Sequence, residues 1–440
     1  MAKALRGLAA CLGVLAVCVP LVLWCASPAD PGTTSTTSTV AGSQRVSSTL
    51  PASVTSTLPT RVSSTLPPVI HTTTTVAPAV KIRIAAVGDV LTHLQIIDSA
   101  RDYRTGGYDF APILAPIAPY LSAADYTIAN LETRLAGAGE GFGGYPLLNS
   151  PDELAAGLKS AGIDLLATAN NHSLDQGWEG VLATLDTVEA AGLAHVGTYR
   201  SQAERDVPFV VGVSGIKLAF LNYTAETNGL PLPRGREFAV GVLDPLTVAG
   251  DVRAARARGA ELVIAILHYG NEYARIPSGS QVKVSEQLLA AGVDAIIGSH
   301  PHVVEPIERV LDSSDPRAAG KFVAYSLGNF ISGQRWRYSD SGIVLYLDIE
   351  KDRSGARIAG VEYLPIYVER GEVDGRVQYR VVPVVPGQAP VSDLTVTAET
   401  RARMDQVWEE LHALLDRPED YIQALDPARL GLPSMLVPAT

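Results

Sequence analysis

Hydrophobic and polar positions alternate with two different periods from Lys81 onward. Short runs rich in β-branched residues alternate with stretches that repeat at helical spacing, and each run ends in a turn or a polar cluster. The runs that predict strands are 81–87, 126–130, 164–169, 217–223, 262–268, 295–298 and 321–327. Alternating strands and helices predict an α/β layered domain in which much of the sheet is buried.

Three further patterns complete the expected elements. Ser150-Pro151-Asp152-Glu153 reads as a capping box with proline at the first helical position, and it predicts a helix that runs to Gly162. Residues 343–349 and 358–368 alternate with period two and predict antiparallel strands of a terminal sheet layer. A docked amphipathic helix is predicted near the C-terminus, where Met404, Val407, Trp408, Leu411, Leu414 and Leu415 keep helical spacing.

The first 80 residues follow other patterns. Lys3 and Arg6 precede an apolar run from about Gly7 to Ala26, which is the order of an export signal and is also long enough to span a bilayer. We expect residues 1–26 to be a signal peptide or a transmembrane anchor and favour a retained anchor over cleavage or a buried helix. Residues 27–80 are nearly all Ser, Thr, Pro, Val and Ala, and they predict a disordered stalk.

We therefore expect four parts, which are the segment 1–26, the stalk 27–80, an α/β domain over 81–385 and a helical extension over 386–440. The expected location is the extracytoplasmic face of the cell membrane, held by a single N-terminal anchor. If the signal is cleaved, the protein is secreted instead.

Composition limits the chemistry available to residues 81–440, which we call the body. The chain has a net charge of −11, and because residues 1–80 carry +3, residues 81–440 carry −14. A body this acidic is a poor non-specific binder of nucleic acid, so we expect no nucleic-acid partner. The three cysteines, Cys11, Cys18 and Cys25, all lie within the first 25 residues. Any metal site or nucleophile in the body must therefore use oxygen and nitrogen atoms.

Polar residues that suit a metal site follow five of the predicted strands. The carboxyl ends of strands are where open α/β sheets place their sites. Taken singly, each of these strand ends is a weak signal, because a Gly-Asp pair is usually a turn and a lone histidine is usually structural. The residues at the five ends are Asp89, Glu132, Asn171 with His172, His268, and His300 with His302.

The pair His300 and His302 is a stronger signal than the others. Residues i and i+2 of an extended segment project to the same side, and Pro301 favours extended geometry in the residue before it. Both imidazoles are therefore expected to face one ion. A mixed set of carboxylate, amide and imidazole ligands suits one or two divalent ions of Mn, Fe or Zn, and Mg is compatible.

These strand ends resemble the ordered motifs of the CapA/PgsA capsule-synthesis family, which functions in bacterial poly-γ-glutamate production. The resemblance covers about Ile84 to Ile349. It rests on six motifs in order: Gly88-Asp89, Asn130-Leu131-Glu132, Ala169-Asn170-Asn171-His172-Ser173-Leu174-Asp175, His268-Tyr269-Gly270-Asn271-Glu272, Gly298-Ser299-His300-Pro301-His302 and Tyr325-Ser326-Leu327-Gly328-Asn329-Phe330. That family is similar in turn to calcineurin-like metallophosphoesterases, so the resemblance implies a two-sheet α/β sandwich flanked by helices around a dinuclear site.

The resemblance implies a role for each matching residue. Asp89 matches a ligand of the first metal, Glu132 takes the place of a bridging aspartate, and Asn171 matches an asparagine ligand. His268, His300 and His302 match the late histidine ligands, and His172 matches a proton-donating histidine. The sequence departs from the phosphoesterase pattern at two places. Leu91 stands where that pattern has a histidine, and Asn-Leu-Glu replaces its bridging Gly-Asp.

An active site of this kind would perform metal-assisted hydrolysis with His172 protonating the leaving group. Asp175 would orient His172, or alternatively would cap the helix expected over 176–191.

The function predicted from the sequence is that of a membrane-anchored CapA-like protein acting in synthesis or export of a poly-γ-glutamate capsule polymer. Its partners would be the membrane, a membrane polymer synthase, and an anionic polymer or phosphoester substrate. Enzymatic activity is left open, with a metal-dependent phosphoesterase-like hydrolase as the candidate. The alternatives are a general secreted metallophosphoesterase or nucleotidase, and a non-catalytic scaffold for the synthase.

Overall fold

The structure is a computed structural model that describes residues 79–311, 320–390, 392–395, 397–430 and 436–438. The predicted N-terminal segment and nearly all of the predicted stalk lie outside the described residues. The described residues belong to one contact unit, which spans 74–440. No helix among the described residues is long and apolar enough to cross a membrane.

Two β-sheets form the framework, and together with the helices they confirm the predicted two-sheet α/β sandwich. The first sheet has the order β14 (Arg376–Pro383), β13 (Gly355–Val373), β12 (Ser341–Asp352), β1 (Val80–Leu91), β2 (Tyr126–Leu131), β3 (Leu165–Ala167) and β4 (Ala194–Val196). Strand β11 (Asn329–Ser332) also pairs with β1, and β16 (Ile422–Ala424) pairs with β13. The second sheet has the order β5 (Phe209–Val213), β6 (Ile216–Thr224), β7 (Leu262–His268), β8 (Ala295–Ser299), β10 (Lys321–Ala324) and β9 (Ile307–Val310).

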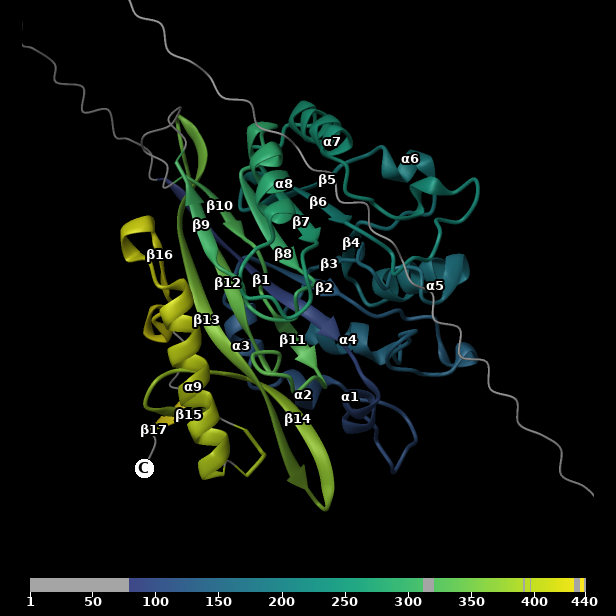
Figure 1. The fold of residues 1–440 in the computed structure, drawn as a ribbon, viewed down its shortest axis with the longest axis vertical. Coiled ribbons are helices and arrows are strands. Elements are labelled where there is room, and N and C mark those ends of the chain that lie inside the picture. The colour runs from purple at the N-terminus through teal and green to yellow at the C-terminus, as the bar shows by residue number, and fades with distance from the viewer. Residues whose placement is uncertain (1–78, 312–319, 391, 396, 431–435, 439–440) are drawn as a thin grey trace, which may run out of the picture. The chain divides into compact units, whose positions relative to one another are not determined.

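Helices connect the parallel strands and cover the outer faces of the sheets, except for the C-terminal helix, which packs on the core between the sheets (Figure 1). Before β4 they are α1 (Leu94–Ser99), α2 (Ala111–Leu114), α3 (Ala118–Ser122), α4 (Glu153–Ser160) and α5 (Gly177–Ala190). After it come α6 (Gln202–Arg205), α7 (Pro245–Ala257), α8 (Gly279–Ala290) and α9 (Ala398–Leu415). A separate small ladder joins β15 (Gln388–Pro390) to β17 (Leu436–Pro438).

Strand β1 shows how one sequence pattern builds three layers. Ile82, Ile84 and Ala86 point into the core between the two sheets, whereas Ala85 and Val87 point into the core under α2, α3 and α4. Successive side chains of a strand project to opposite faces, so a strand buried on both faces is apolar throughout. A third core lies between the second sheet and helices α7 and α8. The cores hold the parallel strands with their carboxyl ends free for polar side chains.

Of the two helices predicted from local patterns, one is confirmed and the other begins at a different residue from the one predicted. The predicted amphipathic helix is confirmed as α9, which runs alongside β13 (Figure 1) and buries Met404, Val407, Leu411 and Leu415. The predicted capping box at Ser150 is wrong, because α4 begins at Glu153 with Asp152 as its N-cap residue. The buried Ser150 hydroxyl lies instead 2.8 Å from the hydroxyl of Thr133 and also contacts that of Thr92.

Candidate metal centre

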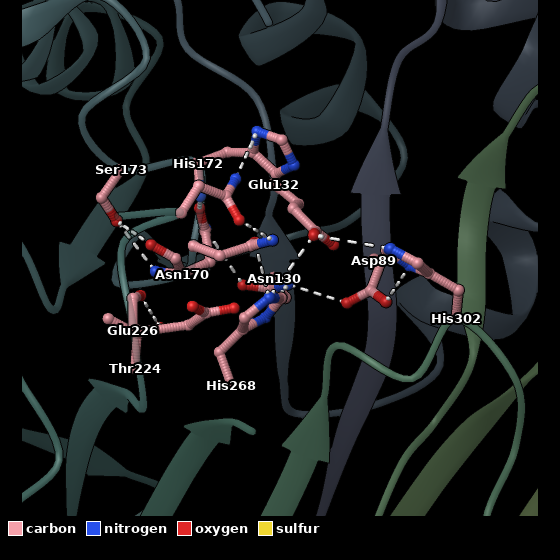
Figure 2. A network of polar contacts seen from close by, with 12 residues as sticks. Asp89, Asn130, Glu132, Asn170, His172, Ser173, Thr224, Glu226, His268 and His302 are labelled. Atoms are coloured by element: carbon pink, nitrogen blue, oxygen red, sulfur yellow. Dashed lines mark hydrogen bonds and ion pairs between the residues drawn. The ribbon is translucent and has the colours of Figure 1, made fainter. Parts of the chain in front are cut away.

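The polar residues at the five strand ends meet in one buried cluster. Two sets of three side chains have ligand atoms within 4.8 Å of one another, namely Asp89, Glu132 and His302, and Glu132, His268 and His300. Both sets are buried, and both contain Glu132. Figure 2 shows Asp89, Glu132 and His302 turned toward one another, with His268 approaching from the neighbouring sheet. The two sheets thus contribute to one centre because their carboxyl ends lie at the same end of the sandwich.

Asp89 is positioned by an irregularity in β1. The register with both β2 and β11 shifts at this point, and Gly88 lies so close to β11 that an added Cβ would be 1.9 Å from the carbonyl oxygen of Gly328. Only glycine fits there, which explains the Gly-Asp pair. The Asp89 carboxylate accepts a 2.8 Å hydrogen bond from Asn130 Nδ2 on one oxygen and lies 3.0 Å from His302 Nδ1 with the other.

Glu132 is the most unusual group of the cluster. Its side chain is 0% exposed, and neither carboxylate oxygen has a hydrogen-bond partner among the described residues. His268 Nε2 lies 3.4 Å and His302 Nε2 lies 3.8 Å from its Oε1 atom. Burial raises the pKa of Glu132 well above its usual value, and the neighbouring Asp89 raises it further. A buried carboxylate without donors is costly unless a cation balances it.

The nearby buried cation does not fill this role. Arg134 is 0% exposed, but its guanidinium donates to the backbone carbonyl oxygen of Leu131 at 2.8 Å, and no hydrogen bond joins it to Glu132. Burial lowers the pKa of Arg134 to about 10. The carboxylate oxygens of Glu132 and the imidazoles around them therefore fit a divalent cation, because they offer oxygen and nitrogen atoms that the chain leaves without donors.

His268 and Asn171 face each other across the centre. His268 Nε2 lies 2.9 Å from Asn171 Oδ1, and His268 Nδ1 lies 3.3 Å from Asn130 Nδ2. Burial lowers the pKa of His268 well below its usual value, and the neighbouring His300 and His302 lower it further. The neutral imidazole and the amide oxygen are thus both available as ligand atoms.

His300 and His302 reach the centre by a different route from the one predicted. Strand β8 ends at Ser299, and the two histidines have positive backbone angles, with φ of 101° at His300 and 59° at His302. The prediction of an extended segment is therefore wrong. Both rings still turn inward, with their centroids 6.2 Å apart. Left-handed geometry at non-glycine residues costs about 1–3 kcal/mol each and is typical of functional loops. Here Tyr273 N donates to the Pro301 carbonyl oxygen at 2.8 Å and holds the loop.

His172 and Asp175 form a separate pair at the edge of the centre. His172 Nδ1 lies 2.7 Å from Asp175 Oδ2, which also accepts the backbone N–H of Leu148 at 2.7 Å. Helix α5 begins at Gly177 with Gln176 as its N-cap residue, so Asp175 orients His172 and does not cap the helix. The ring of Tyr145 meets the His172 ring edge to face, with centroids 6.5 Å apart.

Sequence reasoning did not select four other residues of this region. The Asn130 amide contacts both Asp89 and His268. The only indication of this role in the sequence was its place within one of the quoted motifs. Arg134 and Asn228 had no signal, although Asn228 accepts from Asn171 Nδ2 at 3.1 Å and lies 3.5 Å from His172 Nδ1. His93 had no signal either, and burial together with the neighbouring His302 and His172 lowers its pKa to about 4.

Fold and cluster together define a two-sheet α/β protein with a buried oxygen and nitrogen centre suited to divalent metal. The chain belongs to the family of bacterial capsule synthesis proteins PGA_cap, whose model matches residues 83–334. This confirms the predicted family resemblance.

Two relatives are named for capsule biosynthesis and for PGA biosynthesis, respectively. The chain is 29% identical over 294 residues to the capsule biosynthesis protein CapA of Bacillus anthracis, covering 63% of this chain and 67% of that one. It is 33% identical over 208 residues to the PGA biosynthesis protein CapA of Bacillus subtilis, covering 45% of this chain and 50% of the relative. Among solved structures, the Haemophilus influenzae NAD nucleotidase aligns at 13% identity with a TM-score of 0.43, covering 80% of this chain and 66% of the other.

Proposed function

We propose that this chain is a membrane-anchored, extracytoplasmic accessory protein in the synthesis or export of a poly-γ-glutamate capsule polymer, with a divalent-metal hydrolase site. Family membership and the names of the two relatives support the capsule assignment. One observation carries the hydrolase assignment. Glu132 is shared by two buried ligand sets and has no hydrogen-bond donor on either oxygen.

The ligand roles follow from these two sets. Asp89, Glu132 and His302 would hold one ion, and Glu132, His268 and His300 would hold the other, with Asn171 Oδ1 beside His268 Nε2. Divalent ions at such a site supply Lewis-acid stabilisation of developing negative charge and make a water nucleophile available near neutral pH. Asn130 fixes the first set to the second, because its amide contacts both Asp89 and His268.

His172 is the group placed to deliver a proton. Asp175 accepts the proton-bearing Nδ1 of His172, so the other ring nitrogen, Nε2, is the one left for a substrate oxygen. The backbone N–H of Leu148 holds the same Asp175 oxygen, which fixes the direction of the ring. A histidine oriented in this way can protonate the leaving group as the bond to it breaks.

The acidic charge of the body bears on the partners. Residues 81–440 carry a net charge of −14, which repels a free anionic polymer in solution. Contact with such a polymer therefore requires a local site or a partner that delivers the chain end. A polymer synthase in the same membrane would supply this delivery, and the proposed anchor would hold the body beside it.

The test is metal analysis of the purified full-length chain, followed by a panel of phosphoester, amide and γ-glutamyl substrates. We expect one or two equivalents of Mn, Fe or Zn after dialysis, and metal-dependent turnover of at least one substrate class. A chain that binds no divalent metal would overturn the hydrolase site and favour the scaffold function. Turnover of nucleotides alone, with an unchanged capsule in a deletion strain, would favour a general secreted nucleotidase.

A further inference from the structure

The loop between β11 and β12, residues 333–340, has no role in the proposal so far. We call it the β11–β12 loop. Its tip places three large side chains in solvent, because Arg335 is exposed, Trp336 is 67% exposed and the Arg337 side chain is 75% exposed. Tryptophan and arginine are the residues that protein surfaces most often use to bind a partner.

The base of the β11–β12 loop is tied to the candidate metal centre. Asn329 is the first residue of β11 and pairs with the ligand Asp89 in the sheet register. The Nδ2 atom of this buried residue donates to Gln334 Oε1 at 3.0 Å and to the Ser339 carbonyl oxygen at 2.8 Å. One amide beside the centre thus holds both arms of the loop, and the tip takes a defined place relative to the ligands.

A second contact joins the β11–β12 loop to the histidine ligands. Gln334 Nε2 donates at 3.2 Å to the hydroxyl of Tyr273, whose ring centroid lies 6.1 Å from that of His302. At the tip, the backbone N–H and the hydroxyl of Ser339 both donate to the Trp336 carbonyl oxygen, at 3.0 Å and 2.9 Å. The tip is therefore a closed turn, and a surface ordered in advance loses little entropy when it binds a partner.

The guanidinium groups at the tip are only weakly neutralised. Within the part of the chain that the structure describes, Arg335 makes no ion pair with a carboxylate, and its Nη1 atom donates to the Gln334 carbonyl oxygen at 3.1 Å. Arg337 lies 3.7 Å from Glu410, but that carboxylate also accepts from Arg403 at 3.1 Å. Both groups at the tip therefore keep N–H donors for a further anion.

Aromatic rings support these guanidinium groups without neutralising them. The Arg335 Cζ atom lies 5.1 Å from the ring centroid of Tyr379, and the Arg337 Cζ atom lies 4.6 Å from that of Tyr338. Arg275 lies 4.1 Å from the same Tyr338 centroid, so two cations share one ring. A guanidinium group that packs on a ring can still bind a carboxylate through both of its N–H edges. The tip is thus a local positive surface on a body whose net charge is −14.

We propose that the β11–β12 loop binds an anionic polycarboxylate chain and holds it beside the metal centre. This inference rests on the proposed function in capsule polymer synthesis. Carboxylates along an extended chain can bond to Arg335 and Arg337, while the methylene groups between them lie on the indole ring of Trp336. An anionic membrane is a poorer match, because basic membrane-binding clusters hold about 4–8 Lys or Arg residues and the tip holds two.

The experiment measures binding of fluorescently labelled poly-γ-glutamate to the full-length protein in a neutral detergent, by fluorescence anisotropy. Arg335→Gln combined with Arg337→Gln removes two positive charges from the tip. The matched control, Arg253→Gln combined with Arg258→Gln, removes two charges from exposed positions of α7 and its C-cap. We expect the tip variant to bind the polymer at least about tenfold more weakly than wild type, and the control within about twofold of wild type.

Equal weakening in the tip variant and the control would reduce the effect to overall charge and overturn the assignment. Wild-type affinity in the tip variant overturns it as well. A second measurement uses Trp336, because bound polymer should protect tryptophan fluorescence from quenching by acrylamide in the wild type and not in Trp336→Phe. Unchanged quenching in the polymer-bound wild type, or the same protection in Trp336→Phe, overturns the assignment too.

The failure of the proposed function gives a different result. The binding signal does not depend on turnover, so an inactive hydrolase site leaves these measurements as they are. If the capsule assignment is wrong, the wild type itself does not bind the polymer, whereas an error in the loop assignment alone leaves wild-type binding intact. Wild type that binds vesicles containing phosphatidylglycerol and not the polymer would assign the tip to a membrane surface and overturn the inference.

Discussion

Strand β1 carries an ionic cluster near each end, one half-buried and one buried, and the two clusters balance their carboxylates in different ways. Near its start, Arg83 donates to Asp348 at 2.8 Å and to Glu362 at 2.7 Å, and Glu362 also accepts from Arg429 at 3.0 Å and Gln423 at 3.2 Å. Near its other end, Asp89 and Glu132 face only imidazoles and an amide. Every carboxylate of the first cluster is paired with an arginine of the chain.

The difference separates a structural cluster from a functional one. Buried carboxylates that are matched by guanidinium groups stabilise the native state only modestly, but removing one partner is costly. Buried carboxylates that meet neutral imidazoles keep a negative charge without a positive partner, and a divalent ion can balance that charge. We therefore expect substitutions in the Arg83 cluster to lower the stability of the fold and substitutions in the Glu132 cluster to reduce metal binding.

The largest effect is expected from His300→Ala combined with His302→Ala. Each ligand set loses one of its three side chains, so metal content should fall from the wild-type value to near zero while the far-ultraviolet circular dichroism spectrum is unchanged. Arg83→Met, as the matched control, should retain full metal content and lose stability instead. Metal at wild-type stoichiometry in the double variant would contradict the ligand assignment.

The second effect concerns the proton donor. His172→Ala should reduce turnover of esters with poor alkoxide leaving groups by about 10²–10⁴-fold, which is the usual contribution of general acid catalysis. The loss on a nitrophenyl ester should be much smaller, because nitrophenolate leaves without a proton. Kinetics on both ester types, with metal content measured in parallel, check this expectation. Equal losses with metal retained would remove His172 from the acid role.

A pair of isosteric substitutions compares the two clusters directly in the metal-free protein. Glu132→Gln should raise the free energy of unfolding by about 1–3 kcal/mol, because it removes a buried charge without donors. Glu362→Gln should lower it by about 1 kcal/mol, because the half-buried Arg83 and the exposed Arg429 lose a charged partner. Urea denaturation after exhaustive chelation measures both. Destabilisation of the same sign in both variants would show that the Glu132 cluster is structural as well.

Glu305 extends the comparison to a buried carboxylate that has neither arginine nor a ligand set. One of its oxygens accepts from Gln281 Nε2 at 2.6 Å, and the other has no partner among the described residues. Burial raises the pKa of Glu305 to about 7. A group with a raised folded-state pKa contributes stability that is complete below its unfolded pKa and is lost as the pH rises through the folded pKa.

We therefore expect Glu305→Gln to flatten the dependence of stability on pH between about 4.5 and 7 and to add about 2–3 kcal/mol above that range. Thermal denaturation across this pH range tests the expectation. Glu308→Gln, at an exposed carboxylate three residues away, should leave the pH dependence as it is. A pH profile shared by Glu305→Gln and wild type would mean that Glu305 is ionised in the folded protein.

The smallest effect on the body is expected from deletion of residues 1–26. The full-length protein should fractionate with membranes, and the shortened chain should not, whereas its metal content and thermal midpoint should match those of the full-length protein. Mature protein found wholly in the culture fluid would show that the signal is cleaved.

Several features were readable from local sequence patterns because they depend on neighbours in the chain. The strand runs, the end of a helix at Gly162 and the apolar stripe of α9 follow from period and backbone preference alone. The local pattern at Ser150 is misleading because the Ser150 hydroxyl is hydrogen-bonded to that of Thr133, which is 17 residues away in sequence. A local sequence pattern does not report a hydrogen bond to a residue so far away in the chain.

The sequence by itself determined the α/β class, the family motifs and the residue types at the five strand ends. Only the tertiary structure decided which of those residues share one centre and that His300 and His302 reach it through left-handed backbone. The physical reason is that strand order, sheet pairing and loop closure bring together residues from two sheets, whereas sequence periodicity reports only which face of its own element each residue occupies.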